Sequence, residues 1–335
     1  MSDEHDTGEC GNQQSTAIVA RIESGSSASS SAFGYYGSKQ RLAVDLLKFM
    51  PPHSCWVELF GGALALTLAK KPAQIEVVND LDDNVVNALR QMRDNGEKLA
   101  ELIELTPYAR SELKDARHSS GDETELERAR KFLVQAMMSV NGVVAGKRGG
   151  FSISDAYARQ DREARVNRWY NYPERVKVVS ERLRGVRMEN KDGVELLVQY
   201  SNRPGTLVYI DPPYLADRGR GYSIEASDQR FHERLLSQAL LCKCMVMISG
   251  YESRTYVQLL ENRGGWFRAE LEASTQTTNG DRLGRRELLW MNKSAEHAWR
   301  SGKPCFALTK KEKKDGKVNP TRGQVRRCRR VWRVE

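Results

Sequence analysis

The sequence predicts a doubly wound α/β fold with a mostly parallel sheet, a late antiparallel edge strand and a helical insertion. Short apolar runs alternate with amphipathic helical segments in two blocks, residues 33–95 and 186–291. Such alternation gives parallel strands joined by right-handed crossovers. Residues 96–185 interrupt it with a stretch rich in charged and helix-forming residues. We therefore expect the two blocks to form one sheet and the stretch between them to form a separate unit.

The elements of the first block follow from caps and periodicity. A helix is expected from about Ser38, because serine is a good N-cap and Leu42, Leu46 and Leu47 then share one face until Pro51 ends it. Strands are expected at 55–59 and 75–79, and helices at 61–70 and 83–94.

The second block repeats the same pattern. Strands are expected at 186–188, 206–210 and 244–248, and helices at 192–200, 228–241 and 253–261. Two late apolar runs, 266–271 and 287–291, are typical of an antiparallel hairpin that closes the sheet edge.

Composition sets the expected domain boundaries. Residues 1–32 are Ser-rich, with five acidic side chains and one basic, and are expected to be disordered. The main α/β domain is assigned to 33–95 and 186–295, the insertion to 96–185, and a basic, disordered tail to 296–335. Positive charge gathers in two places: residues 300–335 hold 13 basic and three acidic side chains, and residues 141–187 hold 11 and five. Local basic stretches of this kind favour a polyanionic partner.

Composition also excludes several classes of protein. The 335 residues contain no apolar run long enough to span a membrane and no secretory signal. The six cysteines are scattered, which is not typical of a disulfide framework. Neither Cys242 and Cys244 nor the five histidines have metal-ligand spacing. We therefore expect a cytoplasmic protein with no membrane and no metal.

Residues 207–214 carry the most specific signal. An apolar strand runs directly into Asp211, Pro212, Pro213 and Tyr214, and ligands of open α/β sheets bind at the carboxyl ends of the strands. A flat heterocycle with an amino group could donate to Asp211 and to the Pro212 carbonyl while Tyr214 stacks on its ring. The same residues also suit a proline-stiffened turn with no ligand.

Three upstream features could belong to the same site. Gly61 and Gly62 follow the strand at 55–59, and a strand–glycine–helix turn lets a ligand approach the backbone closely. Asp80 follows the next strand, where an acid can accept hydrogen bonds from ribose hydroxyls, although it could equally cap a helix. Lys39, viewed alone, is indistinguishable from a surface lysine.

Taken in this order, the motifs resemble one family. Phe33-Gly-Tyr-Tyr-Gly-Ser-Lys39, Val57-Glu-Leu-Phe-Gly-Gly62, Val78-Asn-Asp80 and Asp211-Pro-Pro-Tyr214 are similar to the motifs of Dam-like (D12 class, alpha group) S-adenosylmethionine-dependent DNA adenine-N6 methyltransferases of the phage or prophage type. The resemblance covers about residues 33–292. It implies a Rossmann-like methyltransferase sheet and an insertion that recognises the DNA target.

The resemblance also implies roles for individual residues. Those implied to be catalytic are Asp211, Pro212 and Tyr214. Those implied to bind S-adenosylmethionine are Tyr35, Lys39, Glu58, Phe60, Gly61, Asp80 and Asp211. Those implied to contact DNA are Asn141, Lys147 and Arg148, in a loop that resembles the family's DNA-contacting hairpin. Val143 and Val144 stand where many members carry an arginine after Asn-Gly-Leu, which argues against recognition of GATC.

Several functions stay open. The expected reaction is site-specific methylation of a flipped-out adenine in double-stranded DNA, by an orphan enzyme or beside a restriction endonuclease. The alternatives are methylation of another amino group (adenine in RNA, cytosine in DNA or a protein glutamine) and a catalytically silent DNA-binding module.

Overall fold

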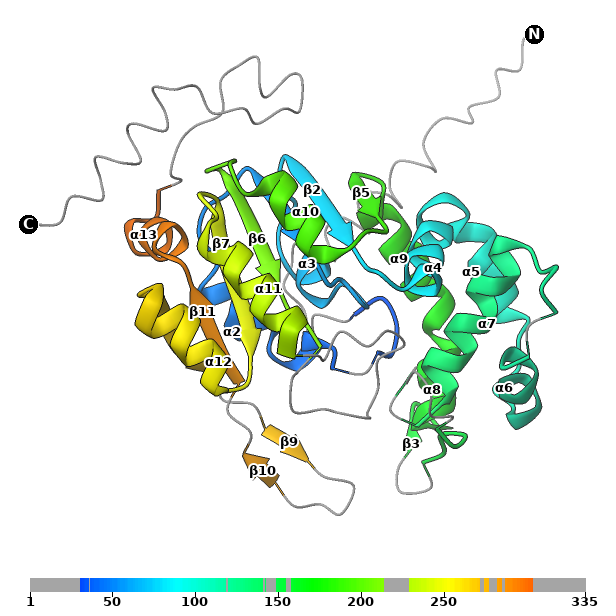
Figure 1. Cartoon of the computed structure of the whole chain (residues 1–335). Helices are drawn as coiled ribbons and strands as arrows, with labels where there is room; N and C mark the ends of the chain where they lie inside the picture. The colour runs from blue at the N-terminus through cyan, green and yellow to red at the C-terminus, as the bar shows by residue number, and fades with distance from the viewer. Residues whose placement is uncertain are drawn as a thin grey trace, which may run out of the picture.

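The computed structural model describes residues 31–35, 37–118, 120–140, 142, 149–154, 158–213, 229–271, 274–276, 282–284 and 287–303. Seven strands form its main sheet, in the order β5-β2-β1-β6-β7-β11-β8 (Figure 1). Their bounds are β1 Cys55–Glu58, β2 Ile75–Asn79, β5 Val186–Glu189, β6 Thr206–Ile210, β7 Met245–Gly250, β8 Phe267–Leu271 and β11 Glu287–Met291.

The direction of the strands confirms the predicted fold class. The pairs β5–β2, β2–β1, β1–β6 and β6–β7 are all parallel. Strand β11 is antiparallel to both β7 and β8. Because β11 runs in the opposite direction, its first residue lies at the edge where the parallel strands end. The short pairs β3–β4 (Ala158–Arg159 and Arg162–Glu163) and β9–β10 (Ser274–Gln276 and Arg282–Gly284) lie outside this sheet.

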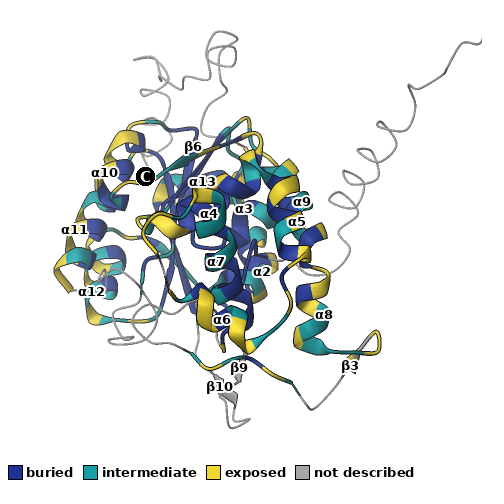
Figure 2. Cartoon of the chain, turned by 90° about the vertical axis from the view of Figure 1, so that its right-hand side faces the viewer, coloured by how far each residue is buried: buried dark blue, intermediate teal, exposed yellow. Residues whose placement is uncertain are grey.

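Alternating strand residues bury two separate cores. One face of the sheet packs against α10 (Gly193–Tyr200) and α11 (Gln229–Leu240). The other face packs against α2 (Ala43–Lys48), α3 (Ala65–Ala69) and α13 (Lys293–Ser301). Within β6, for example, Val208 lies in the first core and Tyr209 in the second, as the two-residue period of a strand requires. Figure 2 shows buried strands behind helices whose outer faces are exposed.

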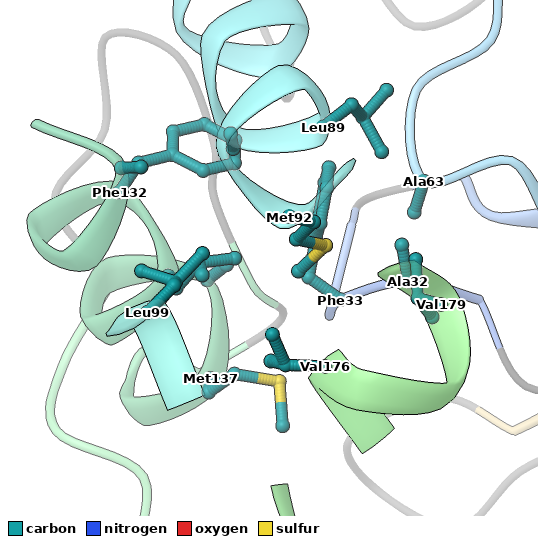
Figure 3. Packing of buried hydrophobic residues seen from close by; sticks show 14 of the residues in the cluster. Ala32, Phe33, Ala63, Leu89, Met92, Leu99, Phe132, Met137, Val176 and Val179 are labelled. Atoms are coloured by element: carbon teal, nitrogen blue, oxygen red, sulfur yellow. The ribbon is translucent and has the colours of Figure 1, made fainter. Parts of the chain in front are cut away.

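The insertion forms a helical unit beside the sheet. Its helices are α5 (Gly96–Glu104), α6 (Arg110–Ala116), α7 (Glu125–Met138), α8 (Ala164–Tyr170) and α9 (Tyr172–Leu183). They pack with α4 (Asp83–Asp94) around a third core, which includes Met92, Leu99 and Val176 (Figure 3). Phe33 reaches this core from the N-terminal segment, so the segment that carries Lys39 is fixed between the two units.

Some expected boundaries are wrong. Residues 296–301 belong to helix α13, whose Ala295 and Ala298 are fully buried, so the tail cannot begin at 296. Ser31 and Ala32 are buried too, so order begins before residue 33. The helix expected from Ser38 is split into η1 (Lys39–Arg41) and α2, and the one expected at 253–261 becomes α12 (Arg254–Tyr256) followed by the π-helical turn η2 (Val257–Arg263). In the part of the chain that the structure describes, no helix is long and apolar enough to cross a membrane.

Candidate functional site

A cleft with about 890 Å³ of open space lies at the carboxyl ends of the parallel strands. The lining residues that the sequence singled out are Tyr35, Lys39, Glu58, Phe60, Gly61, Gly62, Asp80 and Asp211. They come from four separate parts of the sequence, and the parallel sheet brings them to one edge.

The glycine turn after β1 has little room for side chains. The Gly61 N–H donates to the Asn79 carbonyl at 2.7 Å, and a Cβ at Gly61 would lie 2.8 Å from the Leu64 side chain. Gly62 has a φ of +48°, and a Cβ there would lie 3.0 Å from the Tyr35 ring. Both positions therefore favour glycine, and the backbone of the turn forms part of the cleft wall.

Asp80 is tied to this turn by its carboxylate. Its Oδ2 accepts from the Gly62 N–H at 2.8 Å, and its Oδ1 accepts from the Asp82 N–H at 2.9 Å. Burial outweighs these hydrogen bonds and raises the pKa of Asp80 to about 6. Each carboxylate oxygen can accept a second hydrogen bond, so the group can hold the turn and still bind a ligand. It does not cap α4, because that N-cap is Asp82.

Glu58 is the last residue of β1 and is 4% exposed. Its Oε2 accepts from the Thr67 backbone N–H at 3.2 Å and also from the Thr67 hydroxyl. Burial, which outweighs both hydrogen bonds, raises the pKa of Glu58 to about 7. A buried carboxyl that is half ionised near neutral pH is ready to take a cationic ligand.

Asp211 lies directly after β6 and contacts Lys39. The Lys39 ammonium Nζ is 2.7 Å from Asp211 Oδ1, and the two side chains are 6% and 16% exposed. Ser249, on the neighbouring strand β7, donates from its hydroxyl to the same oxygen at 3.1 Å, and its Oγ lies 2.7 Å from the Tyr209 hydroxyl. The carboxylate is therefore fixed in orientation by contacts from two neighbouring segments.

The structure unites only part of the predicted site. Pro212 is buried, and Pro213 rather than Pro212 lines the cleft. Tyr214, Asn141, Lys147 and Arg148 lie outside the described residues. The described residues on either side of the 141–150 loop pair antiparallel, with Val140 N–H donating to Gly150 O at 2.9 Å and Ser152 N–H donating to Met138 O at 2.8 Å.

The sequence missed several residues of the site. Lys191, Asp192 and Gly193 line the cleft from the start of α10, and Phe231 lines it from α11. Lys191, Asp192 and Gly193 could have been found from their place in the sequence. They follow strand β5, and ligands bind where the parallel strands end. Among the described residues, no group of three or more His, Cys, Asp or Glu side chains could hold a metal ion.

Comparison with known proteins agrees with these motifs. Residues 35–262 match the family model of the D12 class N6 adenine-specific DNA methyltransferases. The chain is similar to the type II methyltransferase M1.LlaDCHI of Lactococcus lactis subsp. cremoris, with 30% identity over 192 residues. The match covers 53% of this chain and 63% of that protein, so it spans less than two thirds of the relative. A crystal structure of Thermoplasma acidophilum 1320 aligns over 83% of this chain and 97% of its own, with 9% identity and a TM-score of 0.32, too low to carry an argument.

Proposed function

Because the chain belongs to the D12 class of N6 adenine-specific DNA methyltransferases, we propose that it methylates the exocyclic amino group of an adenine flipped out of double-stranded DNA, with S-adenosylmethionine as the methyl donor. One observation carries the proposal. The glycine turn, Asp80 and Asp211 line a single cleft at the carboxyl ends of the strands, so a cofactor held by the first two would lie beside the third.

The cleft suits S-adenosylmethionine at each part of the molecule. Asp80 would accept from the ribose hydroxyls, as an acid at this place in a doubly wound sheet can do. Glu58, Gly61 and Phe60 would hold the amino-acid end, where the carboxylate of Glu58 matches a cationic amino group. Tyr35, which packs against Gly62, would close one side. When bound, the cofactor supplies a methyl group already activated by its sulfonium.

Asp211 would act on the acceptor nitrogen. The lone pair of the adenine amino group is delocalised into the ring, so the nitrogen is a poor nucleophile. If Asp211 and the Pro212 carbonyl accept its two N–H bonds, the nitrogen is favoured in a pyramidal form with its lone pair directed at the methyl group. Orientation of this kind can supply on the order of 7–11 kcal/mol of barrier reduction. Hydrogen bonding to Asp211 would suffice before attack. The N–C bond would form as the methyl–sulfur bond breaks, and the methylated nitrogen would then pass one proton to Asp211 and from there to solvent.

The position of Lys39 suits a second role besides the predicted contact with the cofactor. It lines the cleft and also forms an ion pair with Asp211 at 2.7 Å. A buried ammonium that donates to a carboxylate fixes the position of that carboxylate. We therefore propose that Lys39 orients Asp211 while its stem contacts the cofactor.

DNA binding would use the insertion and the basic tail. The amino group of adenine is paired in the duplex, so the base must flip out at a cost of a few kcal/mol, and Tyr214 would offer a stacking surface. The loop at 141–150, with Asn141, Lys147 and Arg148, would contact the target, while the basic tail would contact phosphates without reading sequence. A restriction–modification setting in the cytoplasm is proposed because the similar Lactococcus protein is a type II methyltransferase.

Expression in a host that lacks adenine methylation tests the proposal. Sequencing of the host DNA should detect N6-methyladenine at one short motif, and Asp211→Ala should abolish the mark while thermal unfolding stays cooperative. Methylated cytosine in place of adenine would favour the alternative acceptor. A mark that persists in Asp211→Ala would refute the role of Asp211, and no mark from the folded wild-type protein would refute the proposed activity.

A further inference from the structure

Glu287 is a buried acid at the catalytic edge, in a segment, Arg286-Glu-Leu-Leu-Trp290, that resembles the family but for which the resemblance implied no role. It is the first residue of β11 and is 2% exposed. Because β11 is antiparallel to β7, with Leu288 opposite Gly250, its first residue lies where β6 and β7 end. Residues almost 250 positions apart in the sequence thus meet: Glu287 Oε1 lies 3.5 Å from the Lys39 ammonium.

Lys39 is therefore shared between two carboxylates. Its Nζ lies 2.7 Å from Asp211 Oδ1 and 3.5 Å from Glu287 Oε1. Burial opposes the charge of the ammonium, but Asp211 and then Glu287 outweigh it, so the pKa of Lys39 is raised. The lysine stays cationic, and Asp211 receives only part of its charge.

A purely structural role explains this arrangement poorly. Burying a carboxylate costs several kcal/mol, and a buried ion pair can often be replaced by apolar residues without loss of stability. Glu287 also makes the more distant of the two contacts with Lys39. An acid in this place is better explained by its effect on the charge of Asp211, which lines the cleft.

We propose that Glu287 is a positioning residue of the methyltransferase site, which acts by drawing part of the Lys39 charge away from Asp211. Asp211 then keeps more of its negative charge for the amino N–H donors, and the pocket favours the cationic form of the cofactor. The inference rests on the proposed methyl transfer. Glu287 itself contacts neither DNA nor the reacting atoms in this proposal.

Glu287→Gln is the direct test, because the amide can still accept from Lys39 but carries no charge. At saturating DNA and cofactor, kcat should fall about 10-fold, equivalent to about 1.4 kcal/mol in the barrier, while KM for DNA stays unchanged. The ratio of affinities for S-adenosylmethionine over S-adenosylhomocysteine should also fall about threefold or more, because only the former carries a sulfonium. Glu270→Gln, on the neighbouring strand β8 with its side chain 48% exposed, is the matched control and should change neither quantity.

A second pair of variants tests the route through Lys39. If Glu287 acts through the lysine, adding Glu287→Gln to Lys39→Met should cost little beyond the single lysine change, since coupled residues are not additive. Glu287→Asp keeps the negative charge and should recover most of the ratio of affinities for S-adenosylmethionine over S-adenosylhomocysteine. If Glu287→Gln fails to fold, this variant still tests the role of the charge.

The outcomes separate this inference from the proposed function. Wild-type kcat together with a wild-type affinity ratio in Glu287→Gln would overturn the role of Glu287. Fully additive losses in the double variant would overturn the route through Lys39. A wild-type protein that binds the cofactor but methylates no adenine would refute the proposed acceptor, and the affinity ratio would still decide the role of Glu287.

Discussion

Two clusters of buried charge lie toward opposite ends of the parallel strands and are neutralised in opposite ways. Toward the amino end of β2, Glu76 contacts two cations: Lys70 Nζ at 2.6 Å and Arg182 Nη1 at 2.5 Å. At the carboxyl ends, the Lys39 ammonium contacts two carboxylates, those of Asp211 and Glu287. Counted over the ion pairs of the described residues, the first cluster has one acid for two bases, and the second has two acids for one base.

The pKa values differ in the same way. Burial tends to raise the pKa of Glu76, but Arg182 and Lys70 outweigh it, and the pKa is lowered. At the cleft, burial raises the pKa of Glu58 to about 7 and that of Asp80 to about 6. A carboxylate surrounded by cations is a structural brace, here between the sheet and α9 of the insertion. Carboxylates that are buried without such compensation indicate a site that stabilises a cationic or hydrogen-bond-donating ligand.

The largest expected effect is on the brace. Glu76→Gln should destabilise the protein by about 3–5 kcal/mol, because it leaves Lys70 and Arg182 buried side by side with no carboxylate. Since the folded pKa of Glu76 is depressed, its contribution exists above the pKa of an unfolded glutamate and is lost as pH falls through the folded value. Denaturant unfolding at pH 7.5 and at progressively lower pH measures both statements.

The control for this variant lies on the same helix as Arg182. Glu174→Gln, whose side chain is 77% exposed in its pair with Lys177, should change stability by at most about 0.5 kcal/mol. Equal effects of the two substitutions would show that the Glu76 cluster does not brace the insertion against the sheet.

The contribution of Glu58 to stability should depend on pH with the opposite sign to that of Glu76. Its folded pKa is raised to about 7, so its contribution to stability is present below the pKa of an unfolded glutamate and is lost as pH rises through about 7. Glu58→Gln should therefore stabilise the cofactor-free protein at pH 8 by about 2–3 kcal/mol, equivalent to several degrees in Tm. At pH 4, below the pKa of an unfolded glutamate, the variant and the wild type should unfold at nearly the same temperature. An offset in Tm that is the same at both values of pH would contradict a raised pKa.

Much of the cleft could be predicted because its motifs are contiguous in the sequence. Gly61-Gly62 and Asp211 each follow directly after a predicted strand. Because the carboxyl ends of parallel strands share one edge of the sheet, the sequence alone places both motifs at that edge. The parallel strands were predicted from the alternation of strands and helices, and the helical insertion from its helix-forming residues; the order of the strands in the sheet was not predicted.

The partners of Asp211 could not be predicted in this way. Glu287 and Ser249 reach the site only through the pairing of β11 with β7 and of β7 with β6, and a shift of one residue would turn their side chains to the other face. The apolar period predicts that these strands exist but not their register. Lys39 was implied by resemblance alone, because nothing in its local sequence shows that its ammonium is buried between two acids.

The smallest expected effect separates the two roles of acids within the cleft. Asp80→Asn should weaken binding of S-adenosylmethionine about 10-fold, near 1.4 kcal/mol, because it removes a charged acceptor and brings an amide donor toward the N–H of Gly62 or Asp82. S-adenosylhomocysteine has the same ribose, so its affinity should fall by the same factor, whereas Glu287→Gln should weaken mainly the sulfonium form. Asp83→Asn, at an exposed position of α4, is the matched control for calorimetric titration of both ligands. A selective loss of the sulfonium form in Asp80→Asn would mean that Asp80 contributes charge rather than ribose contacts, and the division between ribose-binding and charge-balancing acids would fail.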